Sequence, residues 1–143
     1  MPFIIYFYIM GHCISIYVMN KSELRSEKIN SILENSNKPK PKEAKWIELP
    51  KGILATTYIP NIREFGKGKT IAKISTDYFG GWGHQEAKLF VNNKKEYSNS
   101  SEQDMKLTPI NDVLKMMGVI ADIGKDEFDT IDLGKYRSNY DFK

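Results

Sequence analysis

The sequence predicts an α+β domain in which two or three helices pack on one face of a mainly antiparallel sheet. Two observations support this fold class. The stretch over residues 70–90, TIAKISTDYFGGWGHQEAKLF, alternates polar and apolar residues on both sides of a glycine turn, as two paired strands do. Further segments rich in β-branched and aromatic residues lie between turn signals, and a helical pattern follows residue 108. We expect the rest of the chain to pack onto this hairpin.

The hairpin is the most distinctive part of the sequence. Three glycines surround Trp82, so the backbone can adopt positive φ angles while a large ring stays fixed. We expect a tight, bulged connection between the strands, with Tyr78 and Phe79 leading into the core. The Trp82 ring has two interpretations, a lid folded over the core or an exposed interface anchor, and we favour the lid.

The segments before the hairpin predict strands, a helix and loops. The sequence HCISIYVM over residues 12–19 is typical of a central strand buried on both faces, with Cys13 buried in it. An Asn and a Glu at capping-box spacing begin a helix expected over residues 20–34. The expected elements that follow are a solvated loop over residues 35–45, an apolar segment over 46–49 that ends at Pro50, a strand over 53–59, and a turn over 63–69.

The segments after the hairpin predict one short strand and two helical pieces. The pair Asn92-Asn93 indicates a tight turn into a strand over residues 95–97, which a polar loop over residues 98–103 follows. Thr108 as the N-cap before Pro109 begins a helix that extends to about residue 118. A last helical turn is expected over residues 126–133.

Composition fits one globular domain over residues 1–143. The hydrophobic content of 41% is enough for a core at this length. Residues 1–9 precede a second possible start at Met10, and the fold is expected not to require them. The apolar beginning has no basic leader and is interrupted by polar residues, so neither a secretory signal nor a membrane span is predicted. Cys13 is the only cysteine, which excludes an internal disulfide and favours a reducing compartment.

Charge is distributed unevenly along the chain. Residues 1–100 carry 15 Lys and Arg against 9 Asp and Glu, whereas residues 101–143 carry 6 against 9. The acidic residues of the second part usually form a solvated face, and the less common interpretation is a docking surface for a basic partner. On that interpretation the candidate partner-binding residues are Asp122, Asp126, Glu127 and Asp129, with Trp82 and His84 as a second choice.

No motif for catalysis, a metal or a cofactor stands out, and none of the three is predicted. The GGWG turn joins two strands, whereas a phosphate-binding glycine loop precedes a helix. Cys13 and His84 could act as nucleophile and base only if one exposed edge brought them together, so structural roles are preferred. An alternative function is a small hydrolase or nuclease in which His84 works with Asp77 or Glu86.

A third hypothesis is a nucleic-acid-binding module based on the lysine-rich loop. Its candidates are Lys38, Lys40, Lys42 and Lys45. They lie among prolines with only one aromatic residue nearby, which is a poor match to a nucleic-acid groove. We therefore predict neither a nucleic-acid nor a membrane partner.

Four stretches carry a resemblance to a known family. They are MGHCISIYVMNKSEL, STDYFGGWGHQEAKLF, INDVLKMMGV and DEFDTIDLGKYRS, within residues 10–138. Together they resemble small bacterial immunity proteins encoded beside polymorphic toxins, including those of contact-dependent growth inhibition. The resemblance implies a cytoplasmic, non-catalytic protein that binds the C-terminal domain of one cognate toxin, often a nuclease. The basic first part of this chain departs from a strongly acidic nuclease inhibitor.

Overall fold

A six-stranded sheet forms the centre of the protein. The computed structural model describes residues 11–24, 46–80, 82–103 and 106–142. Within these ranges the strand order is β2-β3-β1-β4-β5-β6, and all neighbouring strands are antiparallel. The strands are β1 (His12–Asn20), β2 (Ile47–Leu49), β3 (Ile53–Thr56), β4 (Thr70–Phe79), β5 (Trp82–Val91) and β6 (Lys94–Glu102). The predicted α+β fold with a mainly antiparallel sheet is confirmed.

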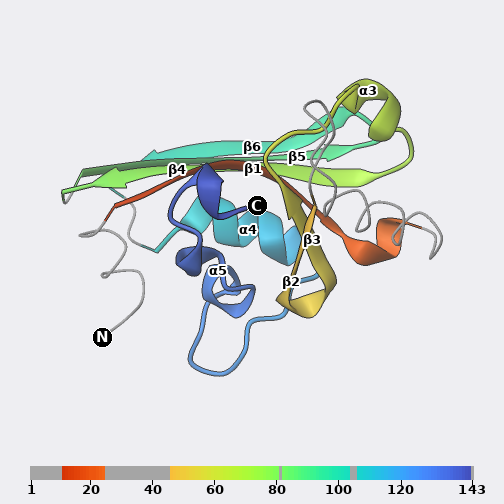
Figure 1. The fold of residues 1–143 in the computed structure, drawn as a ribbon. Coiled ribbons are helices and arrows are strands. Elements are labelled where there is room, and N and C mark those ends of the chain that lie inside the picture. The colour runs from red at the N-terminus through yellow and green to blue at the C-terminus, as the bar shows by residue number, and fades with distance from the viewer. Residues whose placement is uncertain (1–10, 25–45, 81, 104–105, 143) are drawn as a thin grey trace.

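Helices lie unequally on the two faces of the sheet. The described helices are α3 (Ile62–Phe65), α4 (Thr108–Met116) and α5 (Glu127–Thr130), and the 3₁₀ turns are η1 (Lys21–Glu23), η2 (Pro50–Gly52), η3 (Leu133–Lys135) and η4 (Asn139–Asp141). Figure 1 shows α4 and α5 together on one face, as predicted, and the single turn of α3 above one end of the other face. No helix in the described ranges is both long and apolar enough to cross a membrane.

The main core lies between the sheet and the α4–α5 side. The alternation of side chains along strand β1 shows which face of the sheet is covered. His12, Ile14 and Ile16 are buried on the α4–α5 side, whereas Cys13 and Ser15 between them are exposed on the other side. The amphipathic helix α4 packs its apolar side chains against the sheet. A smaller second core lies on the α3 side and contains Met19, Leu24, Trp46, Leu54, Ile59 and Ile71.

The β4–β5 hairpin is confirmed, but its connection is regular. The cross-strand register runs without a shift from Thr70 opposite Val91 to Phe79 opposite Trp82. The register shift that does occur in this part of the sheet lies between β5 and β6. Gly83 is required for packing, since a Cβ atom there would overlap the ring of the buried Tyr78.

Several expectations for individual elements were wrong. Strand β6 continues to Glu102, where a polar loop was expected, because the β5 backbone pairs with it along its length. Cys13 is exposed rather than buried, since only alternate residues of β1 face the main core. Helix α4 has Leu107 at its N-cap, and Thr108 is its first residue. The expected turn over residues 63–69 includes most of α3.

Some expectations lie outside the described residues. These are the dispensable extension over residues 1–9, most of the helix expected over residues 20–34, and the lysine-rich loop over residues 35–45. The described beginning of the expected helix is the short 3₁₀ turn η1.

Candidate functional site

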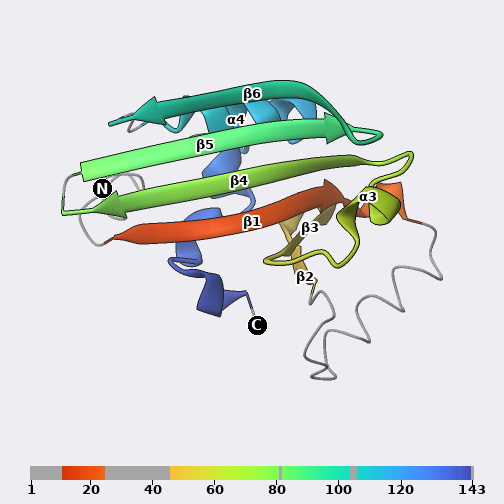
Figure 2. The ribbon, with the colours of Figure 1, turned by 90° about the horizontal axis from the view of Figure 1, so that it is seen from above.

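The sheet face opposite α4 and α5 is the candidate functional site, and we call it the open face. Figure 2 views the molecule from this side, where strands β1, β4, β5 and β6 lie in front of α4, and among the described elements α3 lies over one end. Strand alternation places polar, charged and aromatic side chains on it. They include Cys13, Ser15, Tyr17, Lys73, Ser75, Asp77, Phe79, Trp82, His84, Glu86, Lys88 and Phe90.

Two aromatic side chains are exposed at the hairpin end of the open face. Phe79 is 77% and Trp82 is 71% exposed, and the two residues are cross-strand partners. The predicted lid position of Trp82 is therefore wrong, as is the core position of Phe79. The physical reason is the register, because Tyr78 takes the core-facing position and its neighbour must point the other way. Exposed aromatic side chains of this kind are typical anchors of protein interfaces.

Next to this aromatic pair, His84 lies between two carboxylates. Its cross-strand partners are Asp77 on β4 and Glu102 on β6. His84 is exposed, and among the described residues no hydrogen bond or ion pair joins it to either carboxylate. Neither described pocket includes His84. The hydrolase alternative thus has carboxylates beside the histidine but no described cleft around it.

Cys13 and His84 do lie on the same exposed face, yet not as neighbours. Cys13 is the cross-strand partner of Asp77, and Asp77 is in turn the partner of His84. Cys13 and His84 are therefore two strand spacings apart, on the order of 10 Å. A cysteine nucleophile needs its histidine base within hydrogen-bond reach. This order of residues does not provide that geometry.

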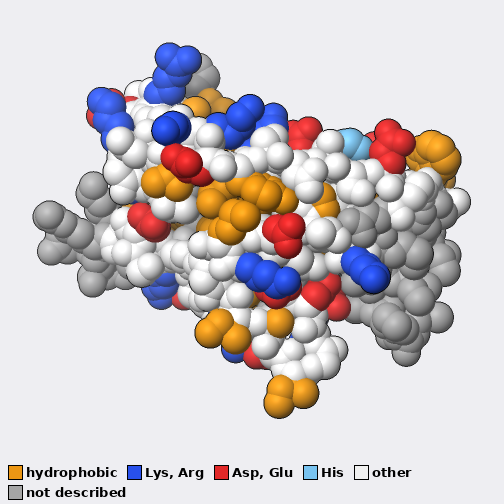
Figure 3. Space-filling view, turned by 180° about the vertical axis from the view of Figure 1, so that it is seen from behind, with side chains coloured by type: hydrophobic (Ala, Val, Ile, Leu, Met, Phe, Trp, Pro, Cys, Tyr) orange, Lys and Arg blue, Asp and Glu red, His pale blue; other side chains and the backbone are white. Residues whose placement is uncertain are grey.

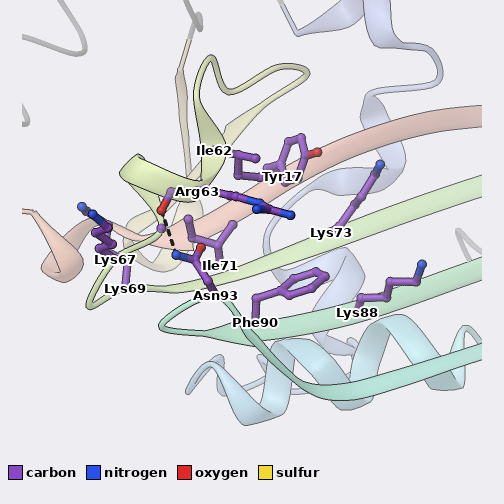
Figure 4. A pocket seen from close by; sticks show the side chains of 11 residues that line it. Tyr17, Ile62, Arg63, Lys67, Lys69, Ile71, Lys73, Lys88, Phe90 and Asn93 are labelled. Carbon is purple, nitrogen blue, oxygen red and sulfur yellow. Dashed lines mark hydrogen bonds between the residues drawn. The ribbon is translucent and has the colours of Figure 1, made fainter.

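A pocket of about 740 Å³ lies at the opposite end of the open face, under α3. We call it the basic groove. Figure 4 shows its side chains coming from strands β1, β4 and β5, from α3 and from two turns. It is lined by Tyr17, Ile62, Arg63, Gly66, Lys67, Lys69, Ile71, Lys73, Lys88, Phe90 and Asn93. Five of these side chains are cationic, and no carboxylate is among them.

The two ends of the open face therefore differ in charge. The basic groove occupies the α3 end, and Asp77, His84 and Glu102 lie toward the hairpin end. Figure 3 shows the same division from behind, with basic side chains along the upper edge toward one end and acidic and hydrophobic ones toward the other. A partner bound across this face would meet both signs of charge.

Two of the predicted acidic residues, Asp126 and Glu127, have structural roles at the start of α5. The Asp126 carboxylate accepts hydrogen bonds from the Asp129 amide at 2.8 Å and from the Asn111 side chain at 3.0 Å. Glu127 is buried, and its carboxylate lies 3.8 Å from the Lys115 ammonium. These local contacts account for both acidic side chains without a binding partner. The Asp126 carboxylate caps the N-terminus of α5, which stabilises the helix, and Glu127 lies near the charge of Lys115.

The other two predicted acidic residues, Asp122 and Asp129, differ in environment. Asp122 forms an exposed ion pair with Lys51 at 2.7 Å, and the hydrogen bond to Lys51 lowers the pKa of Asp122. Burial, followed by the charge of Asp126, raises the pKa of Asp129 to about 6. The acidic segment lies on the α4–α5 side (Figure 1), so it forms no common surface with Trp82 and His84. Whether any of these residues binds a partner stays a prediction.

His12 is a structural residue of the main core. Its Nε2 donates to the Leu133 carbonyl at 3.1 Å, so Nδ1 is the acceptor for the Thr76 hydroxyl at 2.6 Å. The ring also packs edge-on against Phe128. Burial lowers the pKa of His12 to about 4 from an ordinary 6.5.

The described residues were also searched for metal sites, and the chain was compared with known proteins. In the described part of the chain, no three His, Cys, Asp or Glu side chains form a group that could hold a metal ion. Comparisons with protein families, with curated proteins and with solved structures found no match to the chain. The site residues that the sequence did not suggest as functional include Arg63, Lys73 and Lys88, and Phe79, which was expected in the core. Strand register is the signal that would have grouped three of them on one face.

Proposed function

We propose that this protein is an immunity protein, which binds the C-terminal domain of a cognate toxin and neutralises it by direct complex formation. It acts in the cytoplasm of the bacterium that makes it and carries out no catalysis. The open face, and not the acidic segment near α5, is the binding surface. The observation that carries the proposal is the exposed aromatic pair, Phe79 and Trp82, at the end of the open face that lies away from α3.

Physical reasons favour protein binding at this surface. Two large apolar side chains exposed side by side gain free energy when a partner removes them from water, by about 25 cal/mol for each Å² of apolar area. Aromatic residues near the centre of an interface commonly carry much of its binding energy. The charged residues around the pair would then form a polar rim that fixes orientation. The sequence resemblance supplies the class of partner, a toxin domain.

The hydrolase alternative rests on His84 and its carboxylate neighbours Asp77 and Glu86. One observation favours it, namely that His84 is exposed beside Asp77. The two functions make opposite predictions for the substitution His84→Ala. A hydrolase that uses His84 as its base loses activity, whereas an immunity protein anchored by Trp82 still protects cells.

The test of the proposed function is co-expression with the toxin domain encoded beside this gene. Cells that express the toxin domain alone should stop growing, and cells that also express this chain should grow. The two proteins should also co-purify. Growth arrest in both strains would contradict immunity, and protection without a complex would contradict direct neutralisation.

A further inference from the structure

The cations of the basic groove are arranged in a way that opposes stability. Lys73 on β4 and Lys88 on β5 are directly opposite each other in the strand register. Like charges in that position destabilise a sheet. Arg63 extends over the same strands from α3 (Figure 4), which adds a third positive charge. Such a concentration of like charge is expected where a ligand of opposite charge binds.

The roof of the groove is held in place by the turn between β5 and β6. The Asn93 side-chain amide donates to the Arg63 carbonyl at 2.7 Å, and Asn92 accepts from the Gly68 amide at 2.8 Å. Gly66 permits this arrangement, because a Cβ atom there would overlap the Asn93 side chain. The backbone at Arg63 is thus held above the strands before any ligand binds, so binding need order only the Arg63 side chain.

The five cations are not equally available. Lys69 donates to the Phe65 carbonyl at 2.8 Å and lies over the Phe65 ring, so it stabilises α3. Lys67 forms an exposed ion pair with Glu64, and Lys88 forms a half-buried one with Glu86. Among the described residues, no carboxylate lies within ion-pair distance of Arg63 or Lys73, and the Lys73 ammonium lies 5.4 Å from the centre of the Tyr17 ring. Arg63 and Lys73 are the groove's two available positive charges.

The floor of the groove is apolar, which narrows the class of ligand. Tyr17 and Phe90 are half-buried and Ile71 is buried, and all three line the groove. A ligand that fits both features carries negative charge next to an apolar side chain. A protein segment with Asp or Glu beside an apolar residue has that combination. An extended nucleic-acid strand fits less well, because its phosphates would meet Asp77, Glu86 and Glu102 farther along the open face.

We propose that the basic groove receives an acidic segment of the partner protein, whose carboxylates pair with Arg63 and Lys73 while an apolar side chain packs on Tyr17 and Phe90. This inference rests on the proposed function, since it adds a second contact region to the same open face. The aromatic pair anchors one end of the partner, and the basic groove orients the other. The two ends lie on one continuous sheet, so a single partner can reach both.

The experiment measures the dissociation constant of the complex with the adjacent toxin domain by calorimetry, at 50 and 300 mM NaCl. The test variant is Arg63→Glu/Lys73→Glu, and the milder variant Lys73→Gln removes a charge at similar size. The matched control is Lys135→Glu, an exposed lysine whose nearest ion-pair partner is Asp132. The double variant should weaken binding by at least about 30-fold. Lys73→Gln should weaken it severalfold, more at low salt than at high salt.

The possible results distinguish a failure of the groove assignment from a failure of the proposed immunity function. If the unmodified chain binds the toxin domain and both groove variants bind within threefold of it, the groove assignment is overturned and immunity stands. If the unmodified chain does not bind, both are overturned. A separate titration tests nucleic acid, with an oligothymidylate of twelve nucleotides as the probe. Tight binding of that strand, lost in both groove variants, would assign the groove to nucleic acid instead and overturn the inference.

Discussion

Acidification should destabilise this protein through one buried residue, His12. At pH 7 the imidazole is neutral in the folded and unfolded states. Between pH 6.5 and about 4, the unfolded chain binds a proton that the folded protein excludes, because burial lowers the pKa of His12 to about 4. The free energy of unfolding therefore falls as the pH falls through this window. The gap between the two pKa values corresponds to a loss of about 3 kcal/mol by pH 4.

The geometry explains why the folded protein resists this proton. In the neutral ring, Nδ1 accepts from the Thr76 hydroxyl, and protonation would turn that acceptor into a donor. The nearby charge of Arg137 opposes protonation as well, although the Leu133 carbonyl and Asp141 favour it. Burial is the largest of these influences. A loss of 3 kcal/mol is a large share of a typical domain's stability of about 5–15 kcal/mol.

The assay combines two measurements over pH 4–7. Urea unfolding gives the free energy of unfolding, and the difference between the unmodified chain and His12→Gln isolates the contribution of His12 from those of the carboxylates. NMR of the imidazole gives the pKa of His12 directly, and His84→Ala removes the only other histidine signal. A His12 pKa near 6.5, or the same pH dependence with and without His12, would refute the assignment of a buried neutral ring.

Three further predictions concern packing, the acidic segment and the sheet register. Gly83→Ala should lower the free energy of unfolding by about 2–3 kcal/mol, since its Cβ would displace the Tyr78 ring, and a loss below 0.5 kcal/mol would contradict that packing. Asp129→Asn should stabilise the protein by about 1 kcal/mol at pH 7, because a carboxylate with a raised pKa is disfavoured when charged. This advantage should shrink as the pH falls from 6 to about 4, where the unfolded carboxyl is also protonated, and a constant advantage over that range would argue against it. Lys88→Thr should raise the melting temperature, because the repulsion from Lys73 that it removes outweighs the partly exposed ion pair with Glu86, and a lower melting temperature would show that Lys88 stabilises the sheet.

Local patterns in the sequence predicted the strongest parts of the fold. The alternation on both sides of the glycine turn identified the β4–β5 hairpin, and apolar residues at helical spacing identified α4. Strand β6 was underestimated because few of its residues face the core, so its sequence shows little alternation. Backbone pairing with β5 holds the strand, and side-chain patterns do not report on such pairing.

The candidate site was harder to predict, because it depends on register between strands. The side chains of Lys73 and Lys88 come together only once β4 and β5 are aligned, and Arg63 joins them from a turn that the sequence did not identify as a helix. The exposure of Trp82 follows from the same register, since a two-residue connection places it opposite Phe79. Applying strand alternation through the turn would have predicted this. The acidic residues near α5 were predicted as partner-binding from composition alone, and in the structure most of them make local contacts.

The most direct test of the central proposal is the affinity of the Trp82→Ala variant for the toxin domain encoded beside the gene. The matched control is Ile123→Ala, a fully exposed apolar residue in the loop between α4 and α5. If the open face binds the toxin, Trp82→Ala should raise the dissociation constant by about 30-fold or more, while its melting temperature and the affinity of Ile123→Ala stay unchanged. Equal affinities for both variants and the unmodified chain would contradict binding through the open face.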